Sequence, residues 1–466
     1  MDLPARLREL LGTAAVLTGP DELAPYLTDH RGLYHGTAAA MVLPGNTEQV
    51  AQVLAFCHAQ RVPVVPQGGN TGYCGGATPD GSGRAVLLAM RRMDRIRHVD
   101  AANFSLVAEA GCTLAAVQSA ADAAGRLFPL SLGSEGSCQI GGNLATNAGG
   151  TAVLRYGTAR DLTLGIEAVL ADGSVVAQLS PLRKNNTGYD LKNLLIGSEG
   201  TLGVITAACL KLFPQPHLYA TAWVGIPSPA AAIELLARLR AASGDALATL
   251  ELVPEVALQL VLRHVPGARH PGISASAWHL LVEIPDSGRG DADSALTSAL
   301  QQGSEAGLVT DATIARNMAQ REEFWRLRES VPEAQRRAGG SLKHDIAVPV
   351  ASIPSFIAAG TELCARLAPE GYLVAYGHAG DGNLHFNLNQ REGAGKAAFL
   401  AREAPLRRAV HDLVASYGGT FSAEHGIGQL KVDELRRYAS PAGLAAMHRI
   451  KQALDPHHIL NPGKVL

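Results

Sequence analysis

The chain lacks several features that mark nucleic-acid-binding, membrane and secreted proteins. Its 40 Lys and Arg residues balance 42 Asp and Glu residues, and a formal charge of -2 leaves no basic footprint for a polyanion. No apolar run reaches the roughly 18 residues that a membrane helix needs. The start, MDLPARLRELLG, also lacks the pattern of a signal peptide. We therefore expect a cytoplasmic protein that does not bind nucleic acid and has no transmembrane segment.

Patterned cysteines and internal repeats are also missing. The six cysteines never occur as CxxC, which argues against a zinc knuckle and against a dense disulfide framework, so we expect reduced thiols. No repeat or low-complexity tract is visible, which excludes solenoids. The 466 residues are 47% hydrophobic and 18% charged, a composition that predicts a globular protein of two domains.

The glycines fall into two groups that outline these domains. Three clusters lie at 68–84, 133–157 and 197–203, and two more lie at 377–382 and 418–428. In the first region, short apolar runs alternate with helical patterns, which predicts an α+β domain. We expect strands at 61–66, 85–90 and 106–111 and a helix at 47–60 there. Between the two glycine groups, we expect a second α+β domain that includes a helix at 230–242 and a strand at 276–285.

The first glycine cluster follows an apolar run, in the stretch VVPQGGNTGYCGG (64–76). Small residues in succession let backbone N–H groups converge on an anion, although an ordinary surface turn has the same composition. The chain has neither GxxxxGK[ST] nor a GxGxxG that opens a helix before an acidic residue, which disfavours a P-loop or a nicotinamide site. In the block 133–176, glycines and neutral polar side chains are suited to close approach by a large flat ligand.

These motifs resemble the FAD-binding domain of the vanillyl-alcohol oxidase/p-cresol methylhydroxylase superfamily. The resemblance rests on PQGGNTG, GSCQIGGNLATNAGG and GYDLKNLLIGSEGTLGVIT in this order, and it spans about residues 38–215. It implies that the following residues bind FAD: Pro66, Gly68, Gly69, Asn70, Thr71, Gly72, Ser137, Gly141, Asn143, Thr146, Gly149, Gly150, Val204 and Ile205. Some members attach the flavin through a histidine in or near the first loop. Asn70 stands there in this chain, so we expect non-covalent FAD.

Two histidines flank a second glycine-rich stretch, GHAGDGNLHFN (377–387). The run 371–389 predicts a strand, a tight turn and a second strand on which Leu384, Phe386 and Leu388 share one face. His378 then faces His385 across the hairpin, as two ligands of one metal would. Histidines are more often surface or satisfied core residues, so a third ligand is needed to support a metal site.

The stretch FSAEHGIGQLK (421–431) offers that ligand, Glu424, followed by His425. Two imidazoles and a carboxylate suit a catalytic zinc site with open positions, and Fe(II), Mn(II) and Co(II) accept the same ligands. We take zinc as the prediction. A metal hydrolase is the alternative from another enzyme class, but it leaves the glycine-rich first half unexplained.

HAGDGNLHFN, AEHGIG and the final ILNPGKVL resemble the metal-dependent D-2-hydroxyglutarate dehydrogenases and the related D-lactate and glycolate dehydrogenases. This resemblance covers nearly the whole chain and implies an FAD domain (1–215), a substrate and metal cap with an antiparallel sheet (216–445) and a returning C-terminal segment (446–466). It also implies that His378, His385 and Glu424 are the metal ligands and that His425 is the catalytic base. Asn387 corresponds to a substrate contact, and Asn461 lies in the tail that returns to the flavin domain.

The implied reaction oxidises a 2-hydroxy acid by moving its Cα hydrogen, as hydride, to flavin N5. A divalent metal lowers the pKa of the hydroxyl, and an imidazole accepts the proton. Arg328 and Lys343 match family positions that bind substrate carboxylates, although a single Arg or Lys is more commonly a solvated surface charge. D-2-hydroxyglutarate, oxidised to 2-oxoglutarate, is the expected substrate, but Pro332 replaces a threonine that some relatives carry, so D-malate and D-lactate stay open.

The resemblance also raises two matters of assembly. The chain is alternatively a flavin subunit of a multi-subunit glycolate oxidase. The sequence marks no surface for a quinone, a cytochrome or an electron-transfer flavoprotein, so the electron acceptor stays open, with an electron-transfer flavoprotein as the candidate that we name. The family resemblance favours a homodimer.

Overall fold

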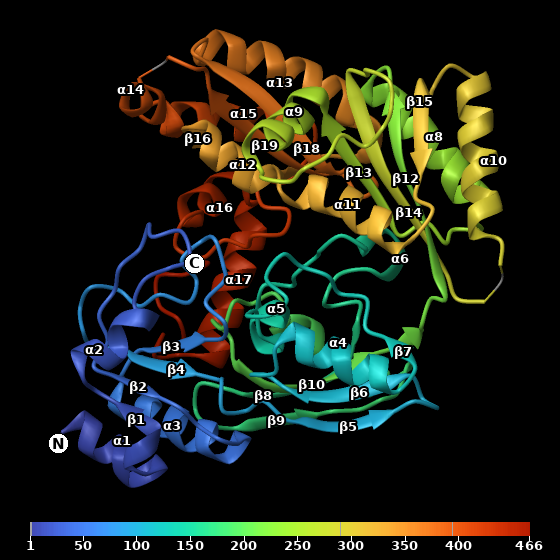
Figure 1. Ribbon diagram of the computed structural model, residues 1–466. Helices are drawn as coiled ribbons and strands as arrows, with labels where there is room; N and C mark the ends of the chain where they lie inside the picture. The colour runs from blue at the N-terminus through green and yellow to red at the C-terminus, as the bar shows by residue number, and fades with distance from the viewer. Residues whose placement is uncertain (1, 289, 394) are drawn as a thin grey trace. The chain divides into compact units, whose positions relative to one another are not determined.

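The computed structural model describes residues 2–288, 290–393 and 395–466 (Figure 1). Helices and sheets occur throughout, so the α+β prediction is confirmed. None of the six cysteines forms a disulfide in this described part of the chain, and all six are buried. Among the same residues, no helix has both the length and the apolar character needed to cross a lipid bilayer.

The chain divides into two compact units. The first unit contains the residues up to Gly150 together with Gly157–Gln215 and Glu424–Leu466, and the second contains Thr151–Tyr156 and Pro216–Ala423. The sequence-based division assigned 424–445 to the cap by its expected binding role. Compactness does not test that role, and the functional division of the chain stays a prediction.

A four-stranded sheet begins the first unit, with the strand order β1-β2-β4-β3. Strands β2 and β3 both run parallel to β4, and the helix between β2 and β3 makes the crossover that parallel strands require. That helix, α3, is the one predicted at 47–60. Asn46 caps it by accepting a hydrogen bond from the backbone N–H of Gln49. The elements of this layer are α1 (Leu3–Leu11), β1 (Val16–Leu17), α2 (Pro20–Leu23), β2 (Ala40–Val42), α3 (Thr47–Gln60), β3 (Val64–Gln67) and β4 (Val86–Ala89).

A five-stranded antiparallel sheet forms the second layer of this unit, with the order β5-β6-β10-β8-β9. Helices α4 and α5 lie over one face of it (Figure 1). Val53 of α3 and Val169 of β8 belong to one core cluster, so α3 joins the two layers. The remaining elements up to Gln215 in this unit are β5 (Ile96–Asp100), β6 (Ser105–Glu109), α4 (Leu114–Ala123), β7 (Arg126–Leu127), α5 (Ile140–Ala145), β8 (Thr163–Val169), β9 (Val175–Gln178), α7 (Leu191–Leu195), β10 (Val204–Lys211) and β11 (Phe213–Pro214).

The C-terminal segment completes the first unit. After α16 (Val432–Tyr438) and α17 (Pro441–Leu454), the chain passes beside β3, where Leu460 forms a parallel bridge with Val64. The backbone N–H of Val64 donates to Ile459 O at 2.8 Å, and that of Asn461 donates to Val64 O at 2.8 Å. The side chains of Ile459 and Leu460 are fully buried in the core of this unit.

A large antiparallel sheet dominates the second unit and confirms the predicted sheet of the second domain. The strand order is β15-β12-β14-β13-β18-β19-β16, and β17 also pairs with β19. Its strands are β12 (Leu218–Ile226), β13 (Thr249–Pro254), β14 (Trp278–Asp286), β15 (Asp311–Ile314), β16 (Ser341–Leu342), β17 (Asp345–Ala347), β18 (Gly371–His378) and β19 (Asn383–Gln390). Its helices are α6 (Val153–Tyr156), α8 (Pro229–Ala242), α9 (Glu255–His264), α10 (Ala292–Glu305), α11 (Met318–Glu329), α12 (Val331–Ala338), α13 (Ile353–Leu367), α14 (Lys396–Leu400) and α15 (Glu403–Ser416).

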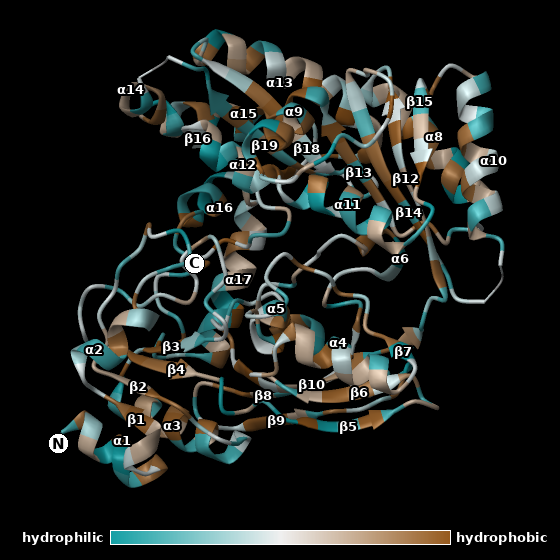
Figure 2. Ribbon diagram, viewed as in Figure 1, coloured by the Kyte–Doolittle hydropathy of each residue, from teal (hydrophilic) through white to brown (hydrophobic). Residues whose placement is uncertain are grey.

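Helices cover both faces of this sheet. Ala222 and Val224 of β12 contact a core formed with α8, α10, α13 and α15, whereas Trp223 between them belongs to a core formed with α9, α11 and α12. This alternation follows from the two-residue period of a strand. The central strands are therefore apolar on both sides, and they appear mostly brown in Figure 2. A charged side chain in such a strand requires a partner.

Candidate active site

The predicted histidine hairpin is present. Strand β18 ends at His378 and β19 begins at Asn383, and the two strands pair antiparallel. Gly382 makes the turn possible, because its φ is +91° and an added Cβ would lie 2.2 Å from the backbone oxygen of Val348. The hairpin is thus fixed by backbone geometry and not by its histidines alone.

Alternation on β19 directs the polar residues away from the core, as predicted. Leu384, Phe386 and Leu388 are buried in the cluster with α13 and α15. His385 consequently lies on the opposite face, and its ring centroid is 5.7 Å from that of His378. The fold-back therefore brings the two imidazoles together.

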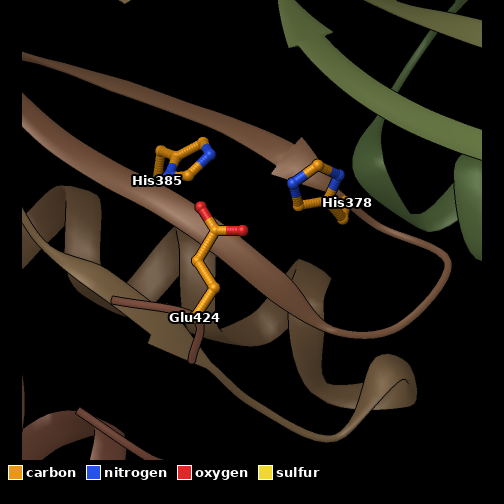
Figure 3. Close-up of side chains that lie close together, drawn as sticks. All are labelled: His378, His385 and Glu424. Atoms are coloured by element: carbon orange, nitrogen blue, oxygen red, sulfur yellow. The ribbon is translucent and has the colours of Figure 1, made fainter. Parts of the chain in front are cut away.

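Glu424 joins the two histidines, although it is 39 residues beyond His385 in the chain. One ligand atom from each of His378, His385 and Glu424 lies within 4.8 Å of the others. Figure 3 shows the carboxylate directed toward the two rings. Two imidazole nitrogens and a carboxylate oxygen are a donor set that fits a divalent transition metal.

A second set overlaps the first at Glu424. Ligand atoms of Asp345, Glu424 and His425 also lie within 4.8 Å of one another. Asp345 is directly opposite His385 in the pairing of β17 with β19, and its carboxylate accepts a hydrogen bond from Asn383 Nδ2 at 3.0 Å. The sequence analysis missed Asp345; its only signal was an acidic residue directly before the apolar run IAVPV.

Sequence reasoning also missed Glu251, whose carboxylate lies in the middle of β13. It accepts a 2.6 Å hydrogen bond from Arg328 Nε and forms a short hydrogen bond with His378 Nδ1. Burial opposes ionisation of this carboxyl, but the charges of Arg328 and His378 outweigh burial and lower its pKa to about 2. Glu251 is therefore an anion that contacts both a predicted metal ligand and a predicted substrate-binding residue.

The residues predicted to bind substrate lie on a helix, a strand and a connecting segment of the second unit. Arg328, on α11, is 6% exposed and lies over the ring of Tyr376 at 4.9 Å. Lys343 is exposed between β16 and β17. Asn387, on β19, is buried; its Nδ2 donates to Gln335 Oε1 at 3.0 Å and its Oδ1 accepts from the backbone of His344 at 3.2 Å. The binding role of each stays a prediction.

His425 lies in a loop that the first unit holds through backbone contacts. The carboxylate of Glu199 accepts hydrogen bonds from the N–H groups of Ile427 and Gly428, at 2.7 and 2.8 Å. Burial raises the pKa of the Glu199 carboxyl above its usual range, and these two hydrogen bonds offset only part of that shift. The ring of Tyr73 contacts His425 edge to face, with centroids 4.8 Å apart. Glu199 therefore links this loop to the motif GSEGTLG, a link that sequence analysis did not identify.

The first glycine-rich loop lines a cavity of about 300 Å³ in the first unit. Gly68, Gly69 and Asn70 line it, together with Tyr26 and Arg91. Asn70 has a left-handed backbone, with φ of +53°, and its Nδ2 donates to Thr28 O at 2.8 Å. This is the predicted anion-binding loop.

The other predicted cofactor residues also lie in the first unit. Pro66 is in β3, and Thr71 and Gly72 follow the cavity loop. Ser137, Gly141, Asn143 and Thr146 lie in or beside α5, Gly149 and Gly150 follow that helix, Val204 and Ile205 begin β10, and Asn461 lies in the C-terminal tail.

Comparison with known proteins identifies the family. A family model described as "FAD binding domain" matches residues 38–177, and one described as "FAD linked oxidases, C-terminal domain" matches residues 215–465. The chain belongs to the FAD-linked oxidase family. Its relatives include mitochondrial D-2-hydroxyglutarate dehydrogenases of Bos taurus (40% identical, covering 100% of this chain and 83% of the relative) and Arabidopsis thaliana (38%, 98% and 80%). The D-2-hydroxyglutarate dehydrogenase of Xanthomonas citri pv. viticola is 34% identical, with coverage of 98% and 96%.

Solved structures show the same fold at lower identity. This FAD-linked oxidase resembles p-cresol methylhydroxylase with substrate bound, with a TM-score of 0.79, 19% identity and coverage of 99% and 95% of the two chains. It also resembles alkyldihydroxyacetonephosphate synthase, with a TM-score of 0.75, 18% identity and coverage of 98% and 84%. The predicted family, an FAD-dependent D-2-hydroxyacid dehydrogenase, is confirmed. The cytoplasmic location stays a prediction, since two of these relatives are named as mitochondrial.

Three buried polar atoms of this FAD-linked oxidase fit its cofactor. Gln139 Oε1, Asn143 Nδ2 and Asn461 Oδ1 have no hydrogen-bond partner among the described residues. Asn461 uses its other polar atom, Nδ2, to donate to Gly76 O and Glu199 O at 2.9 and 2.8 Å. Unsatisfied buried polar atoms are costly, so these three atoms fit a ligand with complementary donors and acceptors, as FAD has.

Proposed function

We propose that this enzyme oxidises D-2-hydroxyglutarate to 2-oxoglutarate with non-covalent FAD and a divalent metal ion, which we assign as zinc. The observation that carries the proposal is the convergence of His378, His385 and Glu424. It occurs in a chain that is similar over its length to D-2-hydroxyglutarate dehydrogenases. A metal hydrolase would not need the FAD-binding half.

The two bound groups supply chemistry that the side chains lack. When bound, FAD accepts the C2 hydrogen of the substrate as hydride at N5, and the ion lowers the pKa of the 2-hydroxyl. His378, His385 and Glu424 hold the ion. FAD is held by the loop after β3, the surroundings of α5, the start of β10 and Asn461.

His425 accepts the hydroxyl proton at a ring nitrogen. Its side chain is 25% exposed, so the proton can pass on to solvent, and its Nε2 lies 3.5 Å from Glu424 Oε1. An imidazole suits this step because its ordinary pKa lies near neutral pH.

Arg328, Lys343 and Asn387 bind the substrate. Two cations and an amide suit an acid that carries a carboxylate at each end, and a guanidinium binds carboxylates especially well. Arg328 already contacts Glu251, so the substrate shares this cation with a buried protein carboxylate.

The proposal is tested with the purified full chain under anaerobic conditions. The protein should be yellow, D-2-hydroxyglutarate should bleach it, and a chelator should slow the bleaching while L-2-hydroxyglutarate should leave the colour unchanged. Bleaching by the chain alone also separates a complete enzyme from a flavin subunit of a larger oxidase. Absence of flavin, or bleaching that is insensitive to metal removal, contradicts the proposal.

A second candidate substrate class follows from Pro332. This exposed residue lies in the first turn of α12, four residues after Arg328, where some relatives carry a threonine. The missing threonine hydroxyl weakens the case for D-2-hydroxyglutarate and leaves the shorter acids D-lactate, D-malate and glycolate as the alternative. A panel of these acids, ranked by kcat/KM, decides between the two classes.

We also propose an electron-transfer flavoprotein as the acceptor and a homodimer as the assembly. Both proposals rest on the dehydrogenase relatives. Mixing substrate-reduced enzyme with oxidised electron-transfer flavoprotein tests the first, and sedimentation equilibrium tests the second.

A further inference from the structure

Glu251 is a charged residue in a strand that is otherwise built for burial. Its neighbours Leu250 and Leu252 contact the core on one face of the sheet, and Glu251 is only 1% exposed on the other. Burying an isolated carboxylate is very unfavourable, so a carboxylate in this position depends on its partners. The partners therefore indicate what the residue does.

Strand pairing in the sheet places Glu251 next to His378. The two residues are directly opposite in the antiparallel pairing of β13 with β18. Their side chains are joined by the hydrogen bond between Glu251 Oε1 and His378 Nδ1. Since the backbone register fixes both residues, this contact does not depend on a long flexible side chain finding its partner.

We propose that Glu251 is a positioning residue for the metal ion: it holds the Nδ1–H of His378 and thereby presents Nε2 to the ion. This inference rests on the proposed function, because it assumes that His378 is a ligand. A histidine ligand commonly donates its second ring N–H to a carboxylate, which selects the tautomer, fixes the ring and increases its basicity. Loss of such a partner typically weakens metal binding about 10–100-fold.

Arg328 completes the arrangement on the other oxygen of Glu251. Its Nε donates to Oε2 at 2.6 Å, so one carboxylate is shared between a metal ligand and a predicted substrate-binding cation. Glu251 therefore affects both ends of the bound acid. Its removal should weaken metal binding and should also raise KM for the substrate.

The same sheet contains a matched pair without a histidine. On β14, Glu283 is 5% exposed and accepts hydrogen bonds from Arg321 Nε at 2.6 Å and Arg321 Nη2 at 2.8 Å. Arg321 and Arg328 are seven residues apart on α11, two turns of one helix. Glu283 binds Trp325 and Thr221 in place of an imidazole, at 2.9 Å each. Glu283→Gln is therefore a control for removing a buried carboxylate that is paired with an arginine.

The test measures Zn²⁺ affinity of the FAD-loaded full chain, without substrate, by competition with a chromophoric chelator. Glu251→Gln should bind Zn²⁺ about 10–100-fold more weakly than wild type, whereas Glu283→Gln should remain within about twofold. With Co²⁺ in place of Zn²⁺, the ligand-field bands should change in Glu251→Gln and not in Glu283→Gln. Equal Zn²⁺ affinity in wild type and Glu251→Gln overturns the inference.

Two further variants keep this result interpretable. His385→Ala should lose Zn²⁺; if wild type binds none, or His385→Ala binds it equally well, the proposed metal site fails and not merely the role of Glu251. If Glu251→Gln does not fold because Arg328 is left without its carboxylate, Glu251→Gln/Arg328→Met removes that cation. Weak Zn²⁺ binding by the folded double variant supports the inference, and wild-type affinity overturns it.

Discussion

The two units build their predicted binding residues in opposite ways. In the first unit the residues predicted to bind FAD lie largely where side chains are missing, in the loops after β3 and around α5. In the second unit the predicted metal ligand His378 and the predicted substrate-binding residue Arg328 are buried side chains that both contact Glu251. Substitutions should therefore act differently in the two units. In the first they should block the space for a ligand, and in the second they should leave a buried polar or charged side chain without its partner.

The glycines of the first loop differ in whether protein atoms leave room for a side chain. A Cβ added to Gly69 would lie 1.9 Å from the backbone oxygen of Ser137, so the protein itself excludes a side chain there. A Cβ added to Gly72 would meet nothing within 4 Å among the described residues. The fold thus excludes a side chain at the first glycine and leaves room for one at the second.

The largest effect is expected for loss of a metal ligand. His385→Ala should lower kcat/KM on the order of 10⁴-fold, because a divalent ion contributes several kcal/mol to transition-state stabilisation. Metal analysis and the flavin spectrum should show that the ion is lost and FAD is kept. His217→Ala, at an exposed histidine of the same unit, should behave as wild type. Release of FAD by His385→Ala would contradict the view that FAD binding does not depend on the metal ligands of the second unit.

His425→Ala should lower the rate of flavin reduction on the order of 10³-fold, since general-base catalysis typically contributes that much. Stopped-flow spectroscopy measures the rate, and bound metal should stay near wild type. Loss of the metal would instead make His425 a ligand, in the set with Asp345 and Glu424. Asp345→Asn is the matched control, and it should retain the ion if His378, His385 and Glu424 hold it.

Gly72→Ala sharpens the comparison within the first unit. FAD affinity should fall about tenfold to hundredfold, because an intruding methyl group costs roughly 1–3 kcal/mol in a close-packed site. The melting temperature of the FAD-free protein should not change. Gly69→Ala should destabilise even the FAD-free protein. Unaltered FAD binding by Gly72→Ala would mean that the cofactor does not approach this residue.

The smallest effect is expected at Lys343. Because this lysine is exposed, Lys343→Met should leave the fold intact and raise KM for D-2-hydroxyglutarate about tenfold, the value of one charge-assisted hydrogen bond. KM for D-lactate, which has no second carboxylate, should change less than twofold. Lys396→Met provides an exposed lysine as control. Equal changes for both acids would remove Lys343 from the distal carboxylate.

Local pattern predicted the elements whose geometry is set by nearby residues. The helix at 47–60 was correct because a cap and a periodic apolar face occur in one segment. The strands at 85–90, 106–111 and 276–285 correspond to β4, β6 and β14. The hairpin at 371–389 was correct because glycines enforce the turn and alternation assigns the faces.

Residues whose meaning depends on distant partners were not predictable. Glu251 lies 127 positions before His378, and only the pairing of β13 with β18 brings them together. Glu199 and Ile427 are 228 positions apart. No local period or spacing encodes such contacts, and the acidic residue in TLELVP carries no sign of its partner.

The bridge between Val64 and Leu460 has a consequence for biosynthesis. The second unit is nearly continuous in the chain, so its sheet can form while the ribosome is still translating. The first unit cannot close its core until Ile459 and Leu460 have left the exit tunnel. A premature stop codon upstream of Ile459 would therefore remove two buried residues from this core, and the incomplete first unit would be open to proteolysis.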